Sequence, residues 1–248
     1  MRGIIDDREA IENLLLFCCS HRAAIATRCV DWFRTAKSEA DRLSAAVEAF
    51  ENFIGAAEQL QMTLLSLNMM TKRTGDSFFF LYGRMNIKEG RDEKSGSWRP
   101  LSAGLLLRTL HRIGWRGFQQ YFGLPSYADL RSRFAELPNA IRSERQYRAY
   151  LRGLRDGIRE ALRNRRTPRV TRAYNKVKHG SVVLRVTGTE QVLMVHALSR
   201  RSDSSCRVVA LPYQATLPTV KMFANNTQRI SKLALELLTL RFGPFTNH

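Results

Sequence analysis

The spacing of apolar and polar residues along this chain predicts mostly helix. Apolar residues recur at helical spacing over residues 7–35, which fits one or two helices, and over residues 38–70, which fits one long amphipathic helix. Ser38 suits the N-cap of the long helix, with Asp41 in the position of a capping-box acid. The next stretch, SFFFLYGRMN, fits either a short buried strand or a tight helical turn. Shorter helices are expected over residues 101–135.

A charged stretch rich in Gly and Ser, KEGRDEKSGSWRP at residues 88–100, is typical of an exposed loop. Such a loop can mark a domain boundary or lie within one domain. We therefore expect an N-terminal helical region over residues 1–100, either separate or part of the same domain, and a helical bundle over residues 101–248.

The segment from Pro138 to Arg166 predicts a helix with two different faces. One face consists of arginines at steps of three or four: Arg145, Arg148, Arg152, Arg155, Arg159, Arg163 and Arg166. The opposite face is apolar and should meet the core: Tyr147, Leu151, Leu154, Ile158 and Leu162. Exposed faces normally mix signs, and here only Glu144, Asp156 and Glu160 offer partial relief, which favours a phosphate-binding ridge over an ordinary solvated surface. Gly153 and Gly157 beside Ala161 should let another helix approach closely, within the chain or across a dimer.

Past Gly180 the apolar period changes from helical to alternating. SVVLRVTG, EQVLMVHAL and CRVVALP fit an antiparallel β meander at about residues 181–211, which makes His196 more typical of a sheet residue than of a catalyst. A final helix from Leu217 to Phe242 should close the bundle and end at Gly243. Its expected apolar positions are Met222, Phe223, Ile230, Leu233, Ala234, Leu237 and Leu238. The predicted fold class is therefore mainly α, a helical bundle with a small antiparallel β meander inserted before the C-terminal helix.

The charge of the chain points to a polyanionic partner. The 248 residues contain 40 Lys and Arg against 22 Asp and Glu, a formal net charge of +18, and 32 of the cationic residues are Arg. A guanidinium donates hydrogen bonds in a fork that fits phosphate oxygens, so RNA or other nucleic acid is the expected partner. A GC-rich genome also enriches Arg over Lys without any functional meaning. Such a bias need not lower the number of Asp and Glu residues, so it does not account for the net charge of +18.

Several other classes of function have little support in the sequence. No apolar run approaches the roughly 18 residues of a membrane span, and MRGIIDDREAIEN carries acids where a secretory signal is apolar, so we expect a cytoplasmic protein without a membrane partner. Cys18, Cys19 and Cys29 surround His21, but their spacing fits no standard zinc site and favours core residues. There is no phosphate-binding Gly-rich loop. We predict no metal and no cofactor.

Residues 167–180, TPRVTRAYNKVKHG, predict a short helix with one polar face. Its ends are marked by an N-cap residue, an early proline and a closing glycine: Thr167, Pro168 and Gly180. At about 100° per residue, four polar side chains share a face: Arg172, Asn175, Lys176 and His179. Lys178 lies about 240° from Arg172, off that face.

These residue types suit metal-independent RNA cleavage, in which the 2′-OH attacks the adjacent phosphate. His179 can exchange protons near neutral pH, and Arg172 can stabilise charge on the phosphoryl group. Asn175 can orient either His179 or the phosphate. The second acid or base must come from water, another side chain or a second subunit, and two copies of the helix facing across a dimer would supply it. Lys176 and Lys178 join the arginine face as nucleic-acid-binding candidates.

At these residues the sequence resembles the HEPN superfamily (higher eukaryotes and prokaryotes nucleotide-binding). Its helical-bundle ribonucleases carry Arg, four to six residues, then His, often with Asn directly after the Arg; here six residues separate Arg172 from His179, and the Asn is at 175. YNKVKHG also resembles a variant of bacterial members that reads roughly Asn, Lys, apolar, Lys, His, Gly. The resemblance implies a HEPN endoribonuclease, a toxin or anti-phage defence effector with an antitoxin or defence-system partner. Because one helix lacks a second acid or base, we also expect a homodimer with its site at or near the interface.

Other interpretations stay open. Arg241 and His248 show the same spacing, although Gly243 and Pro244 prevent a single helix there, and His179 can instead cap a helix end, where the dipole favours a cation. If His179 only caps a helix end, the chain is a non-catalytic RNA- or DNA-binding HEPN module, or a regulatory subunit that binds an acidic protein. A further aromatic group can stack bases but is more typical of a core: His111, Trp115, Phe118, Tyr121 and Phe122.

Overall fold

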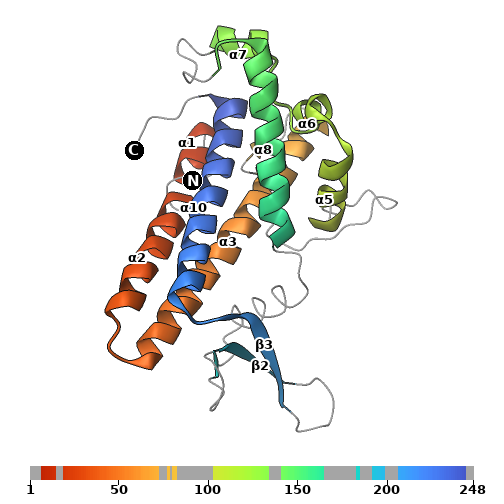
Figure 1. Ribbon diagram of the computed structural model, residues 1–248. Helices are drawn as coiled ribbons and strands as arrows, with labels where there is room; N and C mark the ends of the chain where they lie inside the picture. The colour runs from red at the N-terminus through yellow and green to blue at the C-terminus, as the bar shows by residue number, and fades with distance from the viewer. Residues whose placement is uncertain are drawn as a thin grey trace, which may run out of the picture. The chain divides into compact units, whose positions relative to one another are not determined.

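Helices make up most of the described chain, as the apolar periodicity predicts (Figure 1). The computed structural model describes residues 7–14, 19–72, 77–78, 80–82, 103–133, 141–164, 183–184, 192–198 and 206–243. Because most of these residues are helical, the mainly α class is confirmed. The charged stretch at residues 88–100 lies outside the described residues, so the division there into residues 1–100 and 101–248 stays a prediction.

Three helices are described in the first 72 residues. α1 (Asp7–Asn13) and α2 (His21–Thr35) occupy the region where the pattern allows one or two, and the long α3 (Glu39–Lys72) follows. Ser38 Oγ accepts a hydrogen bond from Asp41 N–H at 3.0 Å and donates one to Asp41 Oδ2 at 2.7 Å. The predicted capping pair is thus present, and the local sequence determines where α3 begins.

A short helical turn comes next. The Phe80 N–H donates to Ser77 Oγ at 3.1 Å, and the Leu81 N–H donates to the Ser77 carbonyl at 3.1 Å. For the described part of this stretch, residues 77–78 and 80–82, the helical turn is the correct one of the two predicted forms.

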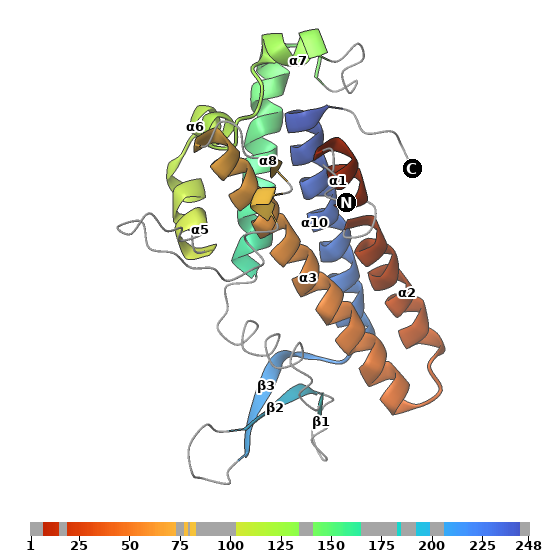
Figure 2. The same ribbon diagram turned by 180° about the vertical axis from the view of Figure 1, so that it is seen from behind.

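The described residues between 103 and 164 contain four helices: α5 (Ala103–Arg112), α6 (Trp115–Tyr121), α7 (Tyr127–Arg133) and α8 (Glu144–Asn164). Their breaks follow local signals. Gly123, just past α6, has a left-handed backbone with φ 60. Ser143 Oγ accepts a hydrogen bond from the Gln146 N–H at 3.3 Å and so caps α8. Figures 1 and 2 both show α5 and α6 beside α8, with α7 at one of its ends.

Three strands pair antiparallel in the order β1, β2, β3: β1 (Val183–Leu184), β2 (Val192–Leu198) and β3 (Cys206–Gln214). Val195 lies opposite Val183 on one side and opposite Val209 on the other. The interpretation of these strands as an insertion into a HEPN-like bundle stays a prediction.

The last helix, α10 (Leu217–Phe242), has the predicted bounds and is followed by Gly243 with φ 112. Six of its seven expected apolar positions are buried: Phe223, Ile230, Leu233, Ala234, Leu237 and Leu238. The prediction for Met222 is wrong, because this side chain is 36% exposed. Phe223 belongs to the buried row that continues through Thr227 and Ile230, and Met222 is turned about 100° from it.

Two compact units make up the chain, and each has a core of its own. One comprises Met1–Cys19, Glu58–Leu162 and Ile230–His248. The other comprises Ser20–Ala57 and Arg163–Arg229. In the first unit Phe78 packs edge-to-face on Phe242, with 5.5 Å between ring centroids. In the second, Phe223 lies 5.4 Å from Phe50 and 5.6 Å from Phe53. Each core therefore joins segments that are far apart in sequence.

No helix among the described residues is both long enough and apolar enough to cross a membrane.

Candidate nucleic-acid interface

The apolar face of α8 is buried, as its spacing predicts. All five expected core residues are at most 3% exposed: Tyr147, Leu151, Leu154, Ile158 and Leu162. Tyr147 Oη also donates a hydrogen bond to the Pro125 carbonyl at 2.8 Å, and burial raises the pKa of its phenol. This face fixes the rotation of α8, and the rotation decides which of its arginines reach the surface.

One of the two α8 glycines lies against another helix. A Cβ at Gly157 would lie 3.1 Å from Leu233 Cδ2 of α10, whereas a Cβ at Gly153 would meet no other described residue within 4 Å beyond its own helix backbone. The close approach predicted from the small residues is therefore confirmed within the chain, at Gly157 only.

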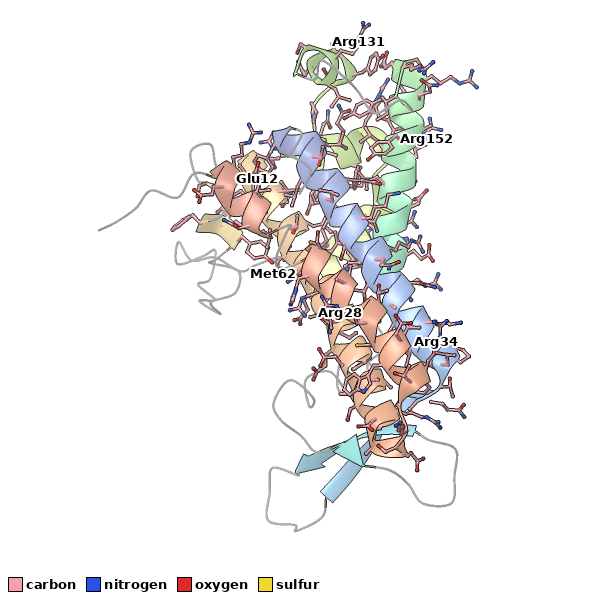
Figure 3. The ribbon with its side chains drawn as sticks, turned by 90° about the vertical axis from the view of Figure 1, so that its left-hand side faces the viewer. Glu12, Arg28, Arg34, Met62, Arg131 and Arg152 are labelled. Atoms are coloured by element: carbon pink, nitrogen blue, oxygen red, sulfur yellow. The ribbon has the colours of Figure 1, made fainter. Side chains whose placement is uncertain are left out.

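Three arginines of α8 are exposed: Arg145, Arg152 and Arg163. None of them forms a hydrogen bond or ion pair with another described residue. Their separations of seven and eleven residues place them in line on one face, about 10 and 17 Å apart along the axis. Figure 3 shows Arg152 on the outer side of α8. Guanidinium groups in such a row can contact phosphates along one nucleic-acid strand.

Two other arginines connect α8 to α5. Arg155 Nη1 donates to the Ile113 carbonyl, just past the end of α5, at 3.1 Å, and Arg159 Nη2 lies 2.6 Å from His111 Nδ1. Asp156 Oδ1 accepts from Arg155 Nε at 3.0 Å and from Arg159 Nη1 at 3.2 Å. One carboxylate thus offsets two guanidinium groups, which have a structural role; their binding of nucleic acid stays a prediction.

The tautomer of His111 follows from its partner. A guanidinium has no acceptor, so Arg159 donates and His111 Nδ1 accepts, which places the proton of the neutral imidazole on Nε2. His111 is exposed at the end of α5, and no local sequence signal predicts this pair because its members are 48 residues apart.

Trp115, the first residue of α6, lies under two guanidinium groups. The distance from its ring centroid is 5.2 Å to Arg116 Cζ and 5.1 Å to Arg148 Cζ. Arg148 Nε also donates to Glu144 Oε1 at 3.1 Å, so the guanidinium of Arg148 is held from two directions. Trp115 itself is half-buried. Trp115 therefore connects α6 to the arginine face of α8, which we call the arginine surface of α8.

The rest of the aromatic group beside Trp115 belongs mainly to the core. Phe118 and Phe122 are fully buried and pack edge-to-face, with 5.1 Å between ring centroids. Tyr121 is half-buried, and its ring centroid lies 5.0 Å from that of Phe122. The core interpretation is confirmed for the two phenylalanines, which are not available for base stacking.

The candidate catalytic stretch lies outside the described residues: Arg172, Asn175, Lys176, Lys178 and His179, together with Arg166 of the arginine face. Their assignment therefore stays a prediction. His196 lies in β2, opposite Val208 of β3.

In the part of the chain that the structure describes, no group of three or more His, Cys, Asp or Glu side chains could hold a metal ion. Cys19 and Cys29 are buried free thiols. Burial, and then the nearby Glu48, raise the pKa of Cys29 to about 11. This thiol stays protonated at neutral pH, when it is neither a ready nucleophile nor a ready ligand. His21 is exposed at the start of α2, and Cys18 lies outside the described residues.

No protein-family model, no curated protein and no solved structure matches the chain.

Proposed function

We propose that this chain binds RNA through the exposed arginines of α8 and cleaves it without a metal ion. The observation that supports the proposal is the row formed by Arg145, Arg152 and Arg163, which has no partner among the described residues. The row ends at Arg163, shortly before the candidate catalytic stretch in the sequence. An effector of this kind acts as a toxin or in defence against phage, under the control of a partner.

The proposed reaction is an attack by the ribose 2′-OH on the adjacent phosphate. The 2′ oxygen loses its proton as it bonds to phosphorus, the bond from phosphorus to the 5′ oxygen breaks, and that oxygen gains a proton. His179 exchanges one of the two protons, Arg172 stabilises the charge on the phosphoryl oxygens, and Asn175 orients one of these groups. The second proton exchange falls to His179 of a second subunit, which is why we propose a homodimer.

The test is RNA cleavage in the presence of a chelator. We expect the wild-type chain to cleave, and His179→Ala to lower the rate about 100-fold or more, because a positioned acid or base typically contributes that much. His21→Gln is the matched control, since His21 is exposed on α2 and has no proposed role. Cleavage at an undiminished rate by folded His179→Ala protein would disprove the assignment.

The second candidate is a non-catalytic RNA- or DNA-binding module. The same exposed arginines support it, because phosphate binding requires no catalyst. RNA binding by the wild-type chain without any cleavage would favour this alternative. Binding of an acidic protein in place of RNA would favour the third, a regulatory subunit.

A further inference from the structure

The arginine surface of α8 includes a feature that binding of phosphate alone does not require. Trp115 lies under the guanidinium groups of Arg116 and Arg148, and the three side chains come from the start of α6 and the first half of α8. All three belong to the same compact unit. Flat guanidinium and indole groups in contact form a surface on which a nucleic-acid base can stack.

The partners of Arg148 make it better suited to stacking than to phosphate binding. Glu144 accepts a hydrogen bond from Arg148 Nε at 3.1 Å and pairs with its Nη2 as well. This carboxylate already offsets the charge of Arg148, so a phosphate would have to compete with it. The same contact, together with the Trp115 ring, holds the guanidinium plane in place, so little side-chain entropy is lost when a base stacks on it.

Exposed arginines without a partner among the described residues flank this group along α8. Arg145 precedes Arg148 by three residues and Arg152 follows it by four, which corresponds to about 4.5 and 6 Å along the helix axis. A stacking surface with a phosphate-binding side chain on each side matches the alternation of base and phosphate along a single strand.

We propose that Trp115, Arg116 and Arg148 form a stacking site for an unpaired base, and that Arg145 and Arg152 bind the phosphates on either side of it. The RNA recognised by this surface is therefore single-stranded, because the bases of a duplex are stacked on one another and their faces are covered. The inference rests on the proposed function only in taking RNA as the ligand; it does not require that the chain cleaves it.

The first experiment measures the binding of the full-length wild-type chain by fluorescence anisotropy. Three probes are compared: a 2′-O-methyl single strand of about twelve nucleotides, its duplex, and an abasic strand with the same number of phosphates. The 2′-O-methyl strand has no free 2′-OH and therefore cannot be cleaved by the proposed reaction. We expect the single strand to bind about 10-fold more tightly than the abasic strand, because stacking of one base typically contributes a factor of this order. Equal affinity for these two strands, or tighter binding of the duplex, would overturn the proposal.

Two variants then locate the site. Trp115→Leu should bring the affinity for the single strand close to that for the abasic strand, which should itself stay unchanged. Trp32→Leu is the matched control, because Trp32 is 42% exposed on α2, outside this surface. A Trp115→Leu chain that keeps the wild-type preference for bases would contradict the assignment.

Arg148→Lys serves if Trp115→Leu does not fold. It keeps the charge but removes the flat guanidinium, so we expect the preference for the base-containing strand to fall several-fold while binding of the abasic strand stays the same. An unchanged preference would count against the stacking site.

Cleavage of unmodified RNA is measured separately. A preference for bases without any cleavage would leave the stacking site in place and remove the proposed ribonuclease activity, whereas cleavage without that preference would do the reverse.

Discussion

Gly153 and Gly157 lie one turn apart on α8 but have different surroundings. Among the described residues, no atom outside the local helix backbone lies within 4 Å of the place that a Cβ at Gly153 would take, whereas the same atom at Gly157 would lie 3.1 Å from Leu233 Cδ2. The sequence shows two equivalent small residues, and only the packing against α10 separates them.

We expect Gly153→Ala to raise the free energy of unfolding by about 0.5 to 1 kcal/mol, because alanine loses less backbone entropy in a helix than glycine. Gly157→Ala should instead lower it by about 1 kcal/mol, since the Leu233 side chain must shift by a few tenths of an ångström in a packed region. Urea unfolding of both variants tests this. If the two substitutions had the same effect, the assignment of Gly157 to the close approach would be wrong.

Cys29 should resist alkylation in the folded chain. Its pKa is raised to about 11 by burial and by Glu48, so little thiolate is present at pH 8. The raised pKa also means that the folded state holds this proton more tightly than the unfolded state. The stabilisation is complete below the unfolded-state pKa of about 8.5 and is lost as the pH rises through about 11. Iodoacetamide labelling, read at Cys29 by mass spectrometry, should be slow until urea unfolds the chain; rapid labelling of the native state would contradict the buried position.

At the scale of a single element, α8 combines a face that holds it in the fold with a face that is free to bind. The buried row from Tyr147 to Leu162 sets its orientation. The guanidinium groups of Arg155 and Arg159 form hydrogen bonds with Ile113, His111 and Asp156. The exposed arginines of α8 remain available for a partner. The arginine spacing predicted one ridge, whereas the contacts with α5 and α6 divide it into arginines with different roles.

The exposed arginines of α8 should determine the salt dependence of RNA binding. Replacing Arg145 and Arg152 with Gln should reduce the slope of log affinity against log salt concentration by about 1.4, which is about 0.7 for each phosphate contact with a single strand. The control carries Gln at Arg28 and Arg42, two exposed arginines of α2 and α3 with the same charge, and should leave the slope near that of the wild type. Equal losses in both variants would mean that the interface is not on α8.

At the scale of the whole molecule, both compact units combine segments that are far apart in the chain. Each draws residues from before and after residue 100, and each takes part of α3 and part of α10. Each core depends on contacts such as those between Phe78 and Phe242, which no local pattern specifies.

The proposed homodimer gives a prediction for mixed chains. If the acid and the base come from two copies of His179, a dimer with one wild-type chain and one His179→Ala chain is inactive, so activity falls as the square of the wild-type fraction. A linear fall would show that each chain acts alone. Sedimentation of the wild-type chain should give twice the 28.4 kDa of one copy.

The sequence by itself determined the features that depend on neighbours along the chain. The helical period placed α8 and α10 and selected the buried face of α8, and the Ser38 and Asp41 pair marked the start of α3. Such signals are readable because helix formation and capping depend on residues within about four positions of each other.

Only the tertiary structure decided which residues of a predicted face are available. Met222 is exposed despite its apolar side chain, Arg159 is engaged by a histidine 48 residues away, and Trp115 lies under Arg148. These outcomes depend on the rotation of each helix and on which helix packs beside it. Those are set by the sum of many long-range contacts, which the spacing of residues along one helix does not encode.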